Sequence, residues 1–414
     1  MKKLFSILFA VVFVFSIITM AQEGEKKDNR YGGYARLYSL GSNPFVVDPD
    51  NIKFNPAYSS TYSNFVWGDI GSNAYAEDNG YGQFFGVNYS ASKELTLGLL
   101  LTRNDFGSSS SIAGLDSRQL VSNVNNILYS SSVPDQLVPL NNNLEVLGSY
   151  KSGNYAFGFG VSYASSSREF TPDSGNAGTT GSASQFGVNL GLIGKVSPTF
   201  EFDFAVSMIL PSASYESQNL NIDASNMYIG ATARGMIELS KKFSLVPTAD
   251  FFMSSGSIDV DTSSNDLPSQ MGFGVGLGLQ YKVENLLLVG GPSFFYDSET
   301  EESTPGTPEL TSSSLTFPAW NFGAEWTFND WLLGRLGYVT STSSATEETP
   351  ASLNTVNEYS ETRFGEGDFR LGIGLRFGGF NLDATVNDDV LRHGFNLIGG
   401  GVRTFAYLSA SYAF

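Results

Sequence analysis

Large apolar residues alternate with small residues along several stretches of this chain. In residues 271–281 every second side chain is large and apolar, and the positions between them hold glycine or glutamine. The same period of two recurs in residues 155–163 and 371–377. Because the side chains of a β-strand point alternately to its two faces, this period predicts strands. The second face carries mostly Gly, Ala and Ser, which is typical of strands that lie between lipid and a crowded interior.

Tight turns and longer polar segments alternate between these strands. Tight connections are expected at Ser92-Lys93, Ser152-Gly153, Ser197-Pro198, Lys241-Lys242, Glu284-Asn285, Asn329-Asp330 and Gly378-Gly379. Long polar loops are expected at about 105–142, 166–182, 211–224, 255–269, 298–314, 343–362 and 390–400. This alternation predicts an all-β fold, an antiparallel transmembrane β-barrel with short periplasmic turns and long outer loops. The hairpins give fourteen strands, and two more near 64–75 and 402–414, which would close the barrel, make sixteen; fourteen is the alternative.

The final stretch, residues 404–414, also alternates. Leu408, Tyr412 and Phe414 share one face, while Ser409 and Ser411 lie on the other. A terminal aromatic residue on such a strand resembles the insertion signal of bacterial outer-membrane β-barrels, which would make the barrel-assembly machinery a partner. A soluble domain has little reason to end in this way, because chain termini usually fray.

The first residues predict export. Lys2 and Lys3 precede an apolar run, residues 4–18, that is too short for a comfortable membrane span. Small residues follow and end at Ala21, so residues 1–21 are predicted to be a cleaved signal peptide, with an uncleaved anchor as the alternative. The expected division is then an N-terminal periplasmic or plug segment at 22–63 and a barrel at 64–414. The expected location is the outer membrane of a Gram-negative-type bacterium.

Composition narrows the chemistry. The formal charge of -18 argues against nucleic acid, which needs Lys and Arg against its phosphates. The chain has no Cys, which excludes a lipoprotein anchor, disulfides and a Cys-ligated metal site. The one histidine, His393, follows Asp388 and Asp389, and we interpret it as a solvated loop residue rather than a catalytic base. Acidic loops near 298–314 and 343–362 are attributed to solvation, with Ca²⁺ binding as the alternative. No enzyme activity, cofactor or metal is predicted.

Isolated charges occur on the predicted strands, opposite the large apolar residues. An arginine that faces lipid near the bilayer midplane would cost about 2–4 kcal/mol, so the lumen is their expected position. There these charges would pair with each other, hold the N-terminal segment or line a polar path. The residues concerned are Asp203, Glu325, Arg335, Arg376 and Arg403.

The longest predicted loop contains an amphipathic stretch. Leu120, Val124, Ile127 and Leu128 fall on one face of a helix. One interpretation is a landing patch for a hydrophobic ligand. The other is a helix that packs on the barrel mouth or on the N-terminal segment, as most amphipathic helices pack within their own protein.

A short motif lies ahead of the first strand. An Asp-rich turn at Asp48 and Asp50 is followed by Asn55-Pro56-Ala57, where proline presets φ and asparagine bonds to nearby backbone. This motif, together with the barrel pattern, resembles the hatch of the long-chain fatty acid transporter family, whose barrels carry a compact N-terminal plug in the lumen. Related barrels serve aromatic-hydrocarbon uptake or assist a secretion system. The family has fourteen strands, against the sixteen counted here.

These observations favour outer-membrane transport of hydrophobic or amphipathic small molecules through a plugged barrel. The expected partners are the outer-membrane lipid bilayer and a hydrophobic small molecule. Two alternatives remain: a structural barrel that holds a secretion component or a surface protein, and a general porin.

Overall fold

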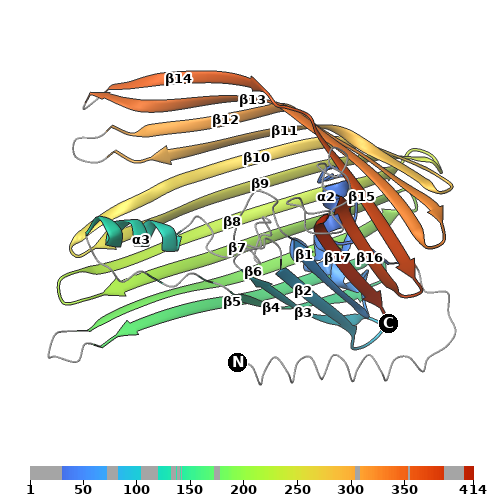
Figure 1. The fold of residues 1–414 in the computed structure, drawn as a ribbon, viewed down its shortest axis with the longest axis horizontal. Coiled ribbons are helices and arrows are strands. Elements are labelled where there is room, and N and C mark those ends of the chain that lie inside the picture. Colours follow the sequence, from blue (N-terminus) through green and yellow to red (C-terminus); the bar gives the residue numbers. More distant parts are fainter. Residues whose placement is uncertain are drawn as a thin grey trace, which may run out of the picture.

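The strands form one closed antiparallel sheet (Figure 1). The computed structural model describes residues 30–71, 83–103, 120–131, 137, 140, 142–171, 178–303, 308–352, 355–386 and 405–414. The sheet closes because the first strand pairs with both the second and the last strand of the chain. The predicted sixteen-stranded barrel and its predicted closing pair are therefore confirmed.

The wall contains seventeen strand segments, two of which share one position in the barrel. The segments are β1 (Phe65–Gly71), β2 (Gln83–Ser90), β3 (Leu95–Arg103), β4 (Asn142–Ser152), β5 (Tyr155–Phe170), β6 (Thr179–Ser197), β7 (Phe200–Glu216), β8 (Asn221–Glu238), β9 (Phe243–Val260), β10 (Ser263–Val283), β11 (Leu286–Glu301), β12 (Leu310–Asn329), β13 (Leu332–Ser352), β14 (Thr355–Phe364), β15 (Asp368–Phe377), β16 (Phe380–Val386) and β17 (Phe405–Ala413). Both β14 and β15 pair with β13, one after the other along its length. They are two parts of one barrel strand, interrupted at residues 365–367.

The seven predicted tight turns are all found between consecutive paired strands, but most of the predicted long loops are wrong. Segments 211–224, 255–269 and 343–362 are largely strand, and strand residues form both ends of 166–182 and 298–314. A barrel strand needs about 9–11 residues to cross a bilayer, whereas β10 and β13 have 21 residues each. The ladder continues past the apolar band into Ser- and Thr-rich sequence, which lacks the alternation on which the prediction depended. The predicted loop at 390–400 lies outside the described residues.

Apolar side chains point outward from this barrel. In β5, Phe157, Phe159 and Val161 are 52, 48 and 43% exposed, whereas the preceding Ala156, on the other face, is 6% exposed. A water-soluble sheet would show the opposite pattern, because exposed apolar patches of this extent are unfavourable in water. The belt faces lipid, and a closed antiparallel barrel with such a belt is the architecture of Gram-negative outer-membrane proteins. The protein is placed in that membrane accordingly.

The described helices lie apart from this belt. They are α2 (Tyr34–Ser39), the 3₁₀ helices η1 (Pro49–Lys53) and η2 (Pro56–Ser60), and α3 (Leu120–Ser130). In the described part of the chain, no helix has the length and hydropathy needed to cross a membrane. In Figure 1, α2 lies among β15, β16 and β17, and α3 lies toward the opposite end of the long strands.

The apolar stripe of α3 is covered by the protein itself. Leu120 is 1% exposed, and Val124 and Leu128 are 0% exposed; Ile127 is partly buried. These side chains pack against inward-facing residues of β5 to β9, including Ile222. The predicted helix is present, and of its two interpretations the structure has the packed one. A ligand-binding role for these four residues stays a prediction and would require the helix to move from the wall.

Candidate functional site inside the barrel

Residues 30–64, called the inner segment below, lie against the inward-facing side of the wall. Their short helices are set by local sequence. The Asp48 carboxylate accepts a hydrogen bond from the Asp50 amide at 3.0 Å, and Asn51 accepts one from the Asp48 amide at 2.9 Å, which forms a capping box at η1. Asn55 caps η2 by accepting from the Ala57 amide at 3.0 Å. The predicted Asn55-Pro56-Ala57 turn is thus the start of η2.

Glycines of the wall make room for the inner segment. A Cβ atom at Gly158 of β5 would collide with the backbone of Pro56 and Ala57. At Gly337 of β13 it would meet the Ser39 carbonyl oxygen at 2.7 Å. The inner face of the strands has small side chains, and the backbone of the inner segment therefore approaches the backbone of the wall closely there.

A chain of buried charges joins the inner segment to β12, β13, β15 and β16. Opposite charges alternate along it in the order Asp48, Arg36, Glu325, Arg335, Asp383 and Arg376. Arg36 lies 2.9 Å from both Asp48 and Glu325. All these side chains are at most 8% exposed. Three positive and three negative groups compensate each other, so the chain of charges is neutral when all are ionised.

Burial and pairing act in opposite directions on the acid at the end of this chain. Burial raises the pKa of the Asp48 carboxyl, the adjacent Arg36 guanidinium offsets only part of that rise, and the resulting pKa is about 7. Desolvation disfavours the charged carboxylate, while an opposite charge favours it. Without the Arg36 guanidinium, the pKa of this carboxyl would rise further.

A second buried group ties the inner segment to β7 and β8. The Tyr58 hydroxyl donates to Asp203 at 2.7 Å and accepts from Arg234 at 2.9 Å. Arg234 also donates to Asp203 at 2.9 Å and to the Val46 carbonyl at 2.9 Å. One arginine thus fixes two places in the inner segment and neutralises a wall carboxylate.

Replacing Tyr58 by phenylalanine should lower the free energy of unfolding by about 1–3 kcal/mol, because two buried polar partners lose a hydrogen bond. Denaturant unfolding of the detergent-folded protein would measure the loss. Tyr129→Phe is the matched control, since Tyr129 is 77% exposed on α3. Equal midpoints for the two variants would contradict a structural role for this hydroxyl.

The structure brings together most of the charges that the sequence singled out. Asp203, Glu325, Arg335 and Arg376 are 4–6% exposed on the inner face, while Arg403 lies outside the described residues, as does His393. A transport role for the four described charges stays a prediction.

On β17, Ser409 and Ser411 are buried on the same inner face. Leu408, Tyr412 and Phe414 are half-buried, and their role as an insertion signal also stays a prediction.

Several partners were missed from the sequence. Arg234, Asp383 and Asp69 are buried on strands at inward-facing positions, so the alternation that selected Asp203 could also have selected them. Arg36 and Lys53 belong to the inner segment, where no periodicity marks the inside. Lys53 pairs with Asp50 and lies 3.4 Å from Asp69 of β1; such contacts follow only from the folded arrangement.

A small cavity lies between the inner segment and β7, β8 and β9. Its volume is about 180 Å³, and Phe54 forms its inner-segment side. On the wall side it is lined by Tyr228, Asp250 and Phe252, with Thr232 beside them. The Tyr228 and Phe252 rings are stacked, with centroids 6.2 Å apart. This aromatic cavity opens toward the inside of the barrel, because Tyr228, Thr232, Asp250 and Phe252 alternate in step with the buried Arg234 and Ser254.

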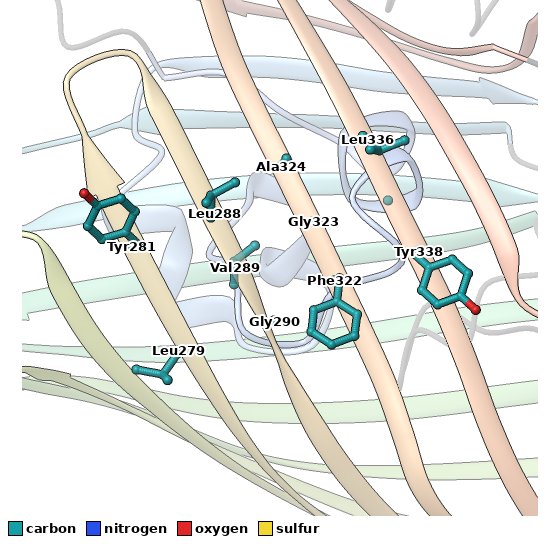
Figure 2. A pocket seen from close by; sticks show the side chains of 11 residues that line it. Leu279, Tyr281, Leu288, Val289, Gly290, Phe322, Gly323, Ala324, Leu336 and Tyr338 are labelled. Carbon is teal, nitrogen blue, oxygen red and sulfur yellow. The ribbon is translucent and has the colours of Figure 1, made fainter.

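A second hollow, of about 380 Å³, lies on the outer surface over β10 to β13. Figure 2 shows Leu279, Leu288, Phe322 and Leu336 around it, and these side chains are 41–50% exposed. The hollow forms because glycines such as Gly290, Gly323 and Gly337 lie between these larger side chains. It faces lipid, so we assign it no part in the interior site.

Comparisons with known proteins assign no family to this chain. No protein-family model matches the chain, and no curated protein matches it. The P. putida toluene transporter TodX is 11% identical with a TM-score of 0.36, over 94% of this chain and 99% of that chain. A Pseudomonas aeruginosa FadL homologue is 12% identical with a TM-score of 0.39, over 94% and 98%.

A further solved structure is larger than this chain. The siderophore receptor PiuA from Acinetobacter baumannii is 8% identical with a TM-score of 0.40, over 78% of this chain and 56% of that chain. The chain thus spans little more than half the length of that receptor. Values this low assign neither a family nor a substrate, and the resemblance to the long-chain fatty acid transporters stays a prediction.

Proposed function

We propose that this protein is a non-enzymatic outer-membrane transporter for hydrophobic or amphipathic small molecules, and that the inner segment is its plug. The observation that carries the proposal is the way the inner segment is held. Two buried ionic groups, around Arg36 and around Arg234, attach the inner segment to the wall. Glycines of the wall leave the space that its backbone occupies. A general porin has no need of such attachments, since its lumen is a water-filled channel.

The nature of the attachment also favours a plug that moves. Ion pairs and hydrogen bonds can be exchanged for water as cargo enters, whereas a purely apolar core would resist wetting. The aromatic cavity beside Phe54 supports a cargo with apolar surface. Burial of that surface provides about 25 cal/mol per Å², so binding needs no energy source in the chain.

Cross-linking the plug to the wall should stop transport. Ser59 of η2 and Ser149 of β4 share a hydrogen bond, with their hydroxyl oxygens 2.8 Å apart, and the chain has no native Cys. Ser59→Cys with Ser149→Cys is therefore expected to form a disulfide, because the two side chains point toward each other and meet at their tips. Uptake of 1-N-phenylnaphthylamine by cells carrying this pair should fall to the level of cells without the protein, and return on reduction.

The single variant Ser59→Cys is the control and should transport normally under both conditions. Planar-bilayer recordings add an independent check, because an occluded barrel should show no large steady conductance. Uptake that is indifferent to the disulfide would remove plug movement from the mechanism. A large steady conductance of the native protein would favour the porin, and copurification with a stoichiometric partner would favour a structural barrel.

A further inference from the structure

The carboxylate in the aromatic cavity differs from the other acids on the inner wall. Asp203, Glu325 and Asp383 each pair with an arginine. Among the described residues, none donates a hydrogen bond to the Asp250 carboxylate, and none forms an ion pair with it. Glu145 also has no hydrogen-bond partner among these residues, but it is fully buried and lines none of the cavities described above. Asp250 is therefore an unpaired acceptor at the edge of an internal space.

The wall is shaped to hold this carboxylate. Asp250 lies opposite Thr232 of β8 and Gly274 of β10 in the sheet register. A Cβ atom at Gly274 would lie 2.7 Å from Asp250 Oδ2, so the glycine leaves the space that the carboxylate occupies. The stacked Tyr228 and Phe252 rings lie in the same cavity. A fixed anion beside aromatic faces is the combination that recognises an organic cation.

The net charge of the chain points the same way. The formal charge of -18 favours the approach of cations and disfavours that of carboxylates such as fatty acids. We infer that the aromatic cavity binds amphipathic molecules with a protonated amine, with Asp250 as the counter-ion and Phe54, Tyr228 and Phe252 around the apolar body. This inference rests on the proposed transport function and narrows its cargo to a chemical class.

Three probes that share one ring and differ in charge provide the test. Calorimetry with detergent-purified protein at neutral pH should show that 2-phenylethylamine binds about tenfold more tightly than 2-phenylethanol, since a hydrogen bond to a charged group is worth more than a neutral one. Phenylacetate should bind most weakly. Asp250→Asn should reduce amine binding by about tenfold, to the level of the alcohol, and leave alcohol binding unchanged.

Two further variants make the result specific. Asp259→Asn removes an exposed carboxylate from the same strand and should leave all three affinities unchanged. Phe252→Leu should weaken amine and alcohol together, because both use the ring. Equal binding of amine and carboxylate, an amine preference that survives Asp250→Asn, or no binding of any probe would each overturn the inference. The disulfide and conductance experiments test the plug without these probes, so the two proposals fail separately.

Discussion

Arg36→Ala is expected to release the inner segment and, if that segment is the proposed plug, to make the barrel conduct. The substitution removes the group that lies between Asp48 and Glu325, so both carboxylates lose a partner while buried. Removal of one member of a buried ion pair costs roughly 3–5 kcal/mol. That cost falls on the attachment of the inner segment rather than on the wall, whose hydrogen bonds run from strand to strand. Single-channel conductance in planar bilayers would measure the opening.

Arg363→Ala is the matched control for this variant. Arg363 pairs with Glu361 on β14, but the two side chains are 73% and 60% exposed. Exposed pairs contribute little, so this variant should remain closed. Heat-dependent electrophoretic mobility would confirm that each barrel is folded. A folded Arg36→Ala barrel that stays closed would show that the chain of charges does not hold the plug.

The strands and tight turns of this barrel could be predicted from local sequence, but the contacts of the inner segment inside it could not. Tight turns such as Ser152-Gly153 and Gly378-Gly379 could be predicted because glycine tolerates a positive φ. In the structure, Gly153 has a φ of +59° and Gly378 one of +63°. Alternation placed Phe157 outside and Ala156 inside because the lipid and the lumen select different side chains. The polar ends of β13 and β14 were mistaken for a loop, since backbone pairing and hydrogen bonds between polar side chains, such as Thr362 to Ser344, maintain them beyond the membrane.

The interior depends on contacts between residues far apart in the chain. Glu325 could be assigned to the lumen from its strand, yet its partner Arg36 lies 289 residues away. No spacing rule connects the two, and the inner segment has no period that would show which face is buried. Asp250 was overlooked for a related reason. It shares a strand face with Val246 and Ser254, and only the fold shows that a cavity opens beside it.

Substitution of a wall glycine offers a way to displace the inner segment without removing any charge. In Gly158→Ala, the new Cβ atom would overlap the backbone of Pro56 and Ala57, and Ala57 Cα would lie 2.6 Å away. Because backbone cannot rotate aside as a side chain can, η2 must move as a unit. That movement would pull Tyr58 from Asp203 and Arg234. Gly158→Ala should therefore conduct in planar bilayers, and the Ser59–Ser149 cross-link should form poorly in its background.

Gly235→Ala on β8 distinguishes this effect from a general intolerance of side chains on the wall. Its Cβ atom would lie 3.2 Å from Pro247 Cγ, a tight contact with a side chain rather than with the inner segment. This variant should stay closed and cross-link as efficiently as the parent pair. If Gly158→Ala also cross-links efficiently and remains closed, η2 accommodates the methyl group and the glycine face is not a seat for the plug. If only Gly158→Ala opens, the small side chains that first indicated strands also shape the space in which the plug rests.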